Sequence, residues 1–195
     1  MKTFKEFMKE IEAKKDNPMV FVDLDGVLAD FFGELWDMYQ VQKNEDAWEN
    51  IKRELTPAQQ DKLVRSIENP IDFFANLSML EGGKKLIAYL NKNNIPFTIL
   101  SAPLKDGGKR TEESIEGKRI WLKNHGLGSV PQIFTHDKYH YAVTNGVNNI
   151  LIDDWKKNIS AWKKAGGIGI KHDDASYLAT IAQLHDILES IDAHI

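Results

Sequence analysis

The stretch that decides the fold is "VFVDLDGVLADF", residues 20–31, in which an apolar run leads into Asp23 and Asp25. A buried strand favours Val-Phe-Val, whereas an isolated carboxylate buried beside it would cost several kcal/mol unless a partner compensated its charge. We therefore expect the two acids where the strand ends. Gly26 allows the chain to turn there, so that both carboxylates can face one crevice.

Short apolar runs alternate with helical periodicity along the 195 residues. The runs that predict strands are residues 19–24, 97–100, 132–135, 149–152 and 168–170. This alternation predicts an α/β fold, a three-layer, Rossmann-like parallel sheet wrapped by helices. Gly166, after "NISAWKKA", is typical of a residue that ends a helix.

The interval between the first two predicted strands is far longer than one crossover helix requires, and it is helical and aromatic-rich. We therefore predict a small helical cap at residues 31–79, inserted after the first strand of a core formed by residues 1–30 and 80–195. Its aromatic residues either pack the insertion or lie near the crevice where open α/β sheets bind ligands. These aromatic residues include Trp36, Trp48, Phe73 and Phe74.

A second acid pair has the same setting, because "NNILIDDW" runs an apolar strand into Asp153 and Asp154. Parallel strands align their carboxyl ends, so both pairs are expected at one edge of the sheet. Either pair alone could equally cap a helix or lie in a solvated loop. Four converging carboxylates without cysteine or histidine between them form an oxygen-only site suited to Mg2+.

A third strand end, "FTILSAP", places Ser101 where its hydroxyl and the following backbone amides can hold a phosphate oxygen. The next stretch, "LKDGGKRTEESIEGKRIWLKNHG", is expected to be an exposed loop followed by a helix that opens near Lys118. A lysine at that point would neutralise the charge of a ligand's phosphate. The alternative for any single lysine is a solvated surface position.

Composition limits the classes of function. A length of 195 residues and a hydrophobic content of 42% suit one domain, or one domain with a modest insertion. A net charge of -4 gives no long-range attraction to nucleic acids or anionic membranes, so we expect neither as a stable partner. The absence of cysteine excludes disulfides and thiolate zinc sites and suits a cytoplasmic location.

The N-terminal segment places Phe4, Phe7, Met8 and Ile11 on one helical face, which predicts a packing helix. A transit peptide is the alternative interpretation, and the acidic residues of this segment and its lack of arginine argue against it.

Together these motifs resemble the haloacid dehalogenase (HAD) superfamily. "VFVDLDGVL" is similar to its first motif, "TILS" to its second, Lys118 to its lysine motif and "ILIDD" to the paired-acid form of its fourth. Within that superfamily the chain resembles the 5'(3')-deoxyribonucleotidase group through "DLDGVLADF", "SAPLK", "GKRIWLKNHG", "FTHDKYHYA" and the "DFF" of residues 72–74. It departs from the group at Ser101, usually threonine, at Ala102, usually serine, and across residues 36–68, which match poorly.

The resemblance implies a mechanism for a phosphoric monoester hydrolase. Asp23 would attack the phosphorus and form an aspartyl-phosphate, while Asp25 would protonate the leaving alkoxide and later activate water. Mg2+ would be held by Asp23, by the backbone carbonyl of Asp25, and by Asp153 or Asp154. The residues implied to contact the substrate phosphate are Ser101, Ala102, Lys105, Lys118 and Lys138.

The expected function is hydrolysis of nucleoside monophosphates, with deoxyribonucleotides preferred by resemblance alone. Phe31, Phe73, Phe74 and Trp36 would offer flat faces for a nucleobase if they line the crevice. Two alternatives stay open: a HAD phosphatase for another small phosphate ester or a nucleic-acid 3'-phosphate, and a non-catalytic Mg2+ or nucleotide-binding module. The preferred base, sugar and phosphate position are also open, as is the oligomeric state, with a homodimer as one option.

Overall fold

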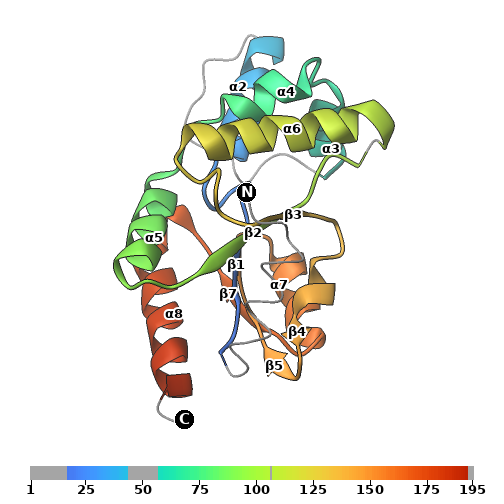
Figure 1. The fold of residues 1–195 in the computed structure, drawn as a ribbon. Coiled ribbons are helices and arrows are strands. Elements are labelled where there is room, and N and C mark those ends of the chain that lie inside the picture. The colour runs from blue at the N-terminus through green and yellow to red at the C-terminus, as the bar shows by residue number, and fades with distance from the viewer. Residues whose placement is uncertain (1–16, 44–56, 106, 193–195) are drawn as a thin grey trace. The chain divides into compact units, whose positions relative to one another are not determined.

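The computed structural model describes residues 17–43, 57–105 and 107–192 (Figure 1). By their contacts these residues form two compact units. The sheet unit takes its residues from 1–29, 79–103 and 129–195, and the helical unit from 30–78 and 104–128. This division places residues 104–128 with the helices, whereas the predicted boundaries assigned them to the core. The cap as a separate inserted domain stays a prediction.

The sheet unit contains five parallel strands in the order β3-β2-β1-β6-β7. They are β1 (Val20–Val22), β2 (Phe97–Ser101), β3 (Gln132–Phe134), β6 (Ile150–Asp153) and β7 (Ile168–Lys171). Each predicted strand is present, so the α/β parallel sheet is confirmed. The central strand β1 is buried throughout and pairs with β2 on one side and β6 on the other.

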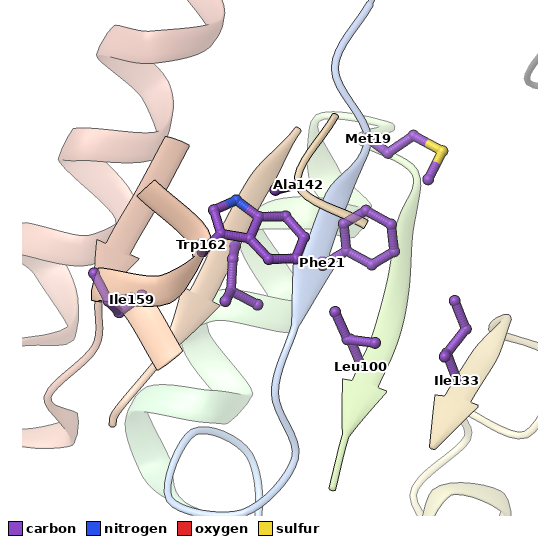
Figure 2. Close-up of a cluster of buried hydrophobic side chains, with 8 residues drawn as sticks. Met19, Phe21, Leu100, Ile133, Ala142, Ile159 and Trp162 are labelled. Atoms are coloured by element: carbon purple, nitrogen blue, oxygen red, sulfur yellow. The ribbon is translucent and has the colours of Figure 1, made fainter. Parts of the chain in front are cut away.

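Helices cover both faces of this sheet (Figure 1). One face carries α5 (Glu81–Lys92) and α8 (Tyr177–Asp192), and the other carries α7 (Lys156–Lys164). A cluster of buried side chains joins the α7 face to the strands, with Ile159 and Trp162 of the helix packed among Phe21, Leu100 and Leu151 of the strands (Figure 2). Because both faces are covered, the strands are apolar on both sides, which is why they read as continuous hydrophobic runs.

Shorter elements connect the strands. A 3-10 turn, η2 (Lys138–Tyr141), and a small hairpin, β4 (Val143–Thr144) with β5 (Val147–Asn148), lie between β3 and β6, and η3 (Asp174–Ser176) precedes α8. Gly166 follows the last turn of α7 with a φ of 97°, so the predicted helix end is confirmed.

The helical unit contains α2 (Phe31–Lys43), α3 (Pro57–Arg65), α4 (Pro70–Ala75) and α6 (Gly108–Asn124). Leu35, Leu63 and Ile67 form its apolar cluster. A helical region after the first strand is therefore confirmed. The predicted start of a helix near Lys118 is wrong, because α6 begins at Gly108 and Lys118 lies in its interior.

Two predictions concern residues that the structure does not describe. The N-terminal packing helix with Phe4, Phe7, Met8 and Ile11 lies outside the described residues, as does Trp48. Within the described part of the chain, no helix has both the length and the apolar content needed to cross a bilayer.

Candidate active site

The first two acids of the site are brought together by strand pairing. Val22 of β1 is in register with Ile152 of β6, and the Asp23 N–H donates to the Ile152 carbonyl at 2.9 Å. Asp23 and Asp153 therefore leave neighbouring parallel strands side by side. Together with Asp154 they form a cluster in which one carboxylate oxygen of each residue lies within 4.8 Å of the others. The predicted convergence of the two strand ends is what the geometry shows.

A turn at Gly26 closes the other side of this cluster. Gly26 has a φ of 76°, and its N–H donates to the Ala29 carbonyl at 2.8 Å. A Cβ atom at this position would collide with the Asp154 carboxylate. Only glycine combines this left-handed conformation with so close an approach, so the turn that follows Asp25 is built around Asp154.

Lys138 lies inside the acid cluster. Its Nζ is 2.7 Å from Oδ2 of Asp23 and 2.7 Å from Oδ2 of Asp153. The three residues are buried, with exposed fractions of 6% for Asp23, 3% for Lys138 and 0% for Asp153. Burial alone would lower the pKa of Lys138, but the charges of Asp23 and Asp153 outweigh it and raise that pKa. The lysine is therefore a firmly charged bridge between the two carboxylates.

The paired acids have different surroundings. Asp153 accepts hydrogen bonds from the Trp155 N–H at 2.8 Å through Oδ1, and from Lys138 and the Asn158 amide through Oδ2. Among the described residues, none donates a hydrogen bond to the Asp154 carboxylate. Burial, with the charge of Asp23, raises the pKa of Asp153 to about 6. Burial and the charges of Asp23, Asp153 and Asp25 raise the pKa of Asp154 to about 8.

The remaining predicted residues of the sheet unit lie at a neighbouring strand end. Ser101 is the last residue of β2 and is buried, and its carbonyl accepts a hydrogen bond from the Thr135 N–H at 3.0 Å. Ala102 follows it and is half-buried. Because β2 pairs with β1, Ser101 emerges at the same edge of the sheet as Asp23.

Five predicted residues belong to the helical unit: Phe31, Phe73, Phe74, Lys105 and Lys118. The rings of Phe31 and Phe74 are stacked at 5.8 Å, and Phe73 meets both edge-on. Phe74 is buried, and the Nζ of Lys118, also buried, lies 4.9 Å from the centre of its ring. Lys105 is exposed. These contacts pack the unit internally, and the substrate contacts of all five residues stay predictions.

The donor set fits a hard cation. Asp23, Asp153 and Asp154 contribute three carboxylates without a thiolate or an imidazole, and Mg2+ and Ca2+ prefer such oxygen ligands. The raised pKa of Asp154 points the same way, because a cation beside it would stabilise the charged carboxylate that burial disfavours. The chemistry of the cluster suits a divalent metal site.

Sequence reasoning underestimated Lys138 and did not identify Asn158. The sequence predicts Lys138 only as a phosphate contact, yet its ammonium contacts Asp23 and Asp153 directly. The sequence does contain one indication of this role. Lys138 closely follows β3, and the end of a strand is also where Asp23 and Asp153 are predicted. Asn158 lies within a helix, where no comparable signal exists.

Most of the chain matches a family of known proteins. The sequence model of the family described as "5' nucleotidase, deoxy (Pyrimidine), cytosolic type C protein" matches residues 17–185. The chain is also similar to a protein named "Putative 5'(3')-deoxyribonucleotidase" from Chlorobaculum tepidum. The two are 23% identical over 169 residues, which cover 82% of this chain and 81% of that protein.

Solved structures share the fold. A HAD hydrolase of family IA, variant 3, from Entamoeba histolytica matches with a TM-score of 0.50 and 16% identity, covering 82% of this chain and 86% of that one. A hydrolase from Streptococcus pneumoniae matches with a TM-score of 0.50 and 12% identity, covering 86% of this chain and 97% of that one. At this identity the likeness concerns the fold alone, and it confirms the HAD-like architecture.

Proposed function

The chain belongs to the deoxy (pyrimidine) 5' nucleotidase, cytosolic type C family, and from that premise we propose that it is a Mg2+-dependent phosphatase that hydrolyses nucleoside monophosphates. The observation that carries the proposal is the cluster of Asp23, Asp153 and Asp154 around Lys138 at the carboxyl edge of the sheet. Open α/β sheets bind their ligands at that edge. The name of the family also supports a cytoplasmic location.

Asp23 is the proposed nucleophile. One carboxylate oxygen would form a bond to phosphorus while the bond from phosphorus to the ester oxygen breaks, which gives an aspartyl-phosphate and an alcohol. Asp23 is oriented for this role, because Oδ1 accepts the Leu24 N–H at 2.7 Å and Oδ2 faces Lys138. Two oriented oxygens leave the carboxylate little freedom to turn away from an approaching phosphate.

Asp25 is the proposed general acid and base. It would give its proton to the leaving alkoxide, and then take a proton from the water that attacks the aspartyl-phosphate. The second step releases inorganic phosphate and returns Asp23 to its carboxylate form. The turn at Gly26 fixes the backbone beside Asp25, and the charge of Asp25 is among those that raise the pKa of Asp154, so Asp25 lies near the cluster.

A divalent cation bound by Asp23, by the backbone carbonyl of Asp25 and by one of the paired acids would offset the charge between the carboxylates and the substrate phosphate. We assign the paired-acid role to Asp154, because Asp153 already accepts three protein donors, whereas none of the described residues donates a hydrogen bond to Asp154. Asp153 instead holds Lys138. The ammonium of Lys138 would reduce the repulsion between Asp23 and the incoming phosphate.

Ser101 and the backbone amides after it would hold a phosphate oxygen at the end of β2. Lys118 and Lys105 are proposed as further contacts to the phosphate, and the aromatic residues of the helical unit as contacts to the base. The description of the family supports deoxyribonucleotides, with pyrimidine bases as the first to test.

Release of inorganic phosphate from a panel of 5'- and 3'-nucleoside monophosphates, measured with Mg2+ and with EDTA, tests the proposal. We expect turnover that requires Mg2+ and that Asp23→Asn abolishes, with an unchanged circular dichroism spectrum. Turnover retained by Asp23→Asn would exclude the covalent route. Turnover of other small esters or 3'-phosphorylated oligonucleotides alone would favour those substrates, and nucleotide binding without turnover would favour a non-catalytic module.

A further inference from the structure

Asn158 is a half-buried residue of α7 whose side chain reaches into the acid cluster. Its Nδ2 donates to Oδ2 of Asp153 at 2.9 Å, the oxygen that also lies 2.7 Å from Nζ of Lys138. The other oxygen, Oδ1, accepts the Trp155 N–H at 2.8 Å. Asp153 is therefore held by two neutral donors in addition to the ammonium.

The two neutral donors fix the orientation of the Asp153 carboxylate, which the ammonium of Lys138 does not. An ammonium group is a compact charge with rotatable donors, so its attraction does not fix the plane of a carboxylate. One directional hydrogen bond on each oxygen does fix that plane. The Trp155 N–H comes from the turn that Asp153 itself begins, whereas the Asn158 amide comes from the body of the helix. Asn158 is thus the contact that ties the orientation of Asp153 to α7.

The helix that presents this amide is itself anchored to the sheet. On the same helix, Trp162 packs edge-on against Phe21 with ring centroids 5.5 Å apart, and Ile159 belongs to the same buried cluster (Figure 2). The indole N–H of Trp162 donates to the Asn149 carbonyl at 3.0 Å. Core packing of this kind does not deform continuously, so α7 holds the Asn158 amide in a fixed place.

We propose that Asn158 is a positioning residue, which orients Asp153 so that Asp153 holds Lys138 against Asp23. The expected effect of Asn158 on turnover rests on the proposed function, whereas its expected effect on the position of Lys138 does not. Loss of the amide would let the Asp153 carboxylate turn and give the Lys138 ammonium a less defined position. Groups that orient the residues of an active site from behind commonly change activity by about 10-fold or more when they are removed.

The kinetic test compares Asn158→Ala with Asn93→Ala, using a chromogenic phosphate ester in saturating Mg2+. Asn93 is the matched control, because its Nδ2 donates to the Tyr89 carbonyl at 2.8 Å on the exposed end of α5. We expect kcat to fall about 10-fold in Asn158→Ala with KM changed less than about twofold, and to stay unchanged in Asn93→Ala. Asn158→Asp keeps the shape but replaces the donor by an acceptor, so it should lose activity as well. Wild-type kcat in Asn158→Asp would mean that Asn158 acts by filling space.

A second readout does not require turnover. In protein labelled with 15N-lysine, the ammonium of Lys138 should give an observable, slowly exchanging signal, because it is buried between two carboxylates. Its absence in Lys138→Arg assigns it. We expect the signal to shift and broaden in Asn158→Ala and to be unchanged in Asn93→Ala.

The kinetic and NMR readouts distinguish a failure of the proposed function from a failure of the role assigned to Asn158. A wild-type protein without phosphatase activity would overturn the proposed function, while the lysine signal would still decide the role of Asn158. An active wild type whose Lys138 signal and kcat are unaffected by Asn158→Ala would overturn this inference alone.

Discussion

Replacement of Lys138 by methionine should destabilise the metal-free protein far more than an ordinary lysine substitution does. The Lys138 Nζ lies 2.7 Å from each of two carboxylate oxygens, and its side chain is 4% exposed. With an effective dielectric of about 20, each attraction is worth about 6 kcal/mol before the desolvation of the charges is subtracted. Methionine keeps the length of the side chain but removes both attractions.

The carboxylates left behind would then repel each other. At the 4.8 Å limit of the cluster, two unit charges repel by about 3.5 kcal/mol with the same dielectric. Removing one partner of a buried ion pair typically costs about 3 to 5 kcal/mol. For a chain of this length that corresponds to a fall in Tm of roughly 10 °C.

Thermal unfolding followed by circular dichroism in EDTA at pH 8 measures this loss. Lys84→Met is the control, because Lys84 pairs with Glu81 at 3.3 Å with both side chains more than half exposed. Such surface pairs contribute about 0 to 1 kcal/mol. The Lys138→Met deficit should shrink at pH 5, where the carboxylates take up protons, and when Mg2+ is added. Equal losses in the two variants, or a deficit independent of pH, would refute the reasoning.

Four further outcomes are expected. Gly26→Ala should weaken Mg2+ binding, measured by calorimetry, by about 10-fold or more, because the added Cβ would displace Asp154. Gly146 also has a positive φ, 82°, but open space around it, so Gly146→Ala should leave Mg2+ affinity unchanged. Equal Mg2+ affinity in the two variants would contradict this. Because burial, with the charge of Asp23 and its neighbours, raises the pKa of Asp154 to about 8, Mg2+ binding must release a proton, so affinity should fall between pH 8 and pH 6. The metal-free protein should likewise lose stability as pH rises from about 4 to 8, since the folded state keeps that proton longer than the unfolded chain; a flat profile in EDTA would exclude the shift. Asp25→Asn should slow hydrolysis of alkyl phosphates far more than that of nitrophenyl phosphate, because only the poorer leaving group needs a proton, and equal slowing would make Asp25 structural.

The strands and the acid cluster could be predicted because both depend on local sequence. A parallel strand buried on both faces must be apolar along its length, and the first polar residue after it marks the edge where ligands bind. Val22 and Ile152, for example, lie in register, so the residues that follow them, Asp23 and Asp153, are neighbours at the sheet edge.

The start of α6 could not be predicted in the same way. Its buried residues Ser114, Gly117 and Lys118 carry no large apolar side chain, and the buried apolar residues Trp121 and Leu122 lie towards the end of the helix. The apolar pattern is therefore weak over the start of α6. The reason is a close contact with α4, where a Cβ atom on Gly117 would meet the backbone carbonyls of Pro70 and Ile71. A pairing between segments so distant in the chain leaves no local signal. For Lys138 the strand end before it is a weak local signal, but its place between Asp23 and Asp153 depends on distant strands.

The paired acids at the end of β6 show why one carboxylate would not be enough for the proposed function. Successive residues at a strand end point to opposite sides, so Asp153 and Asp154 meet different surroundings. Asp153 accepts hydrogen bonds from Trp155, Asn158 and Lys138. The last of these contacts keeps the ammonium of Lys138 beside Asp23. With three protein donors, Asp153 has little capacity left for a metal ion, whereas Asp154, set against the Gly26 turn, accepts no hydrogen bond from the described residues. The pair therefore divides two roles, because Asp153 holds the ammonium of Lys138 and Asp154 is left to bind the proposed metal ion.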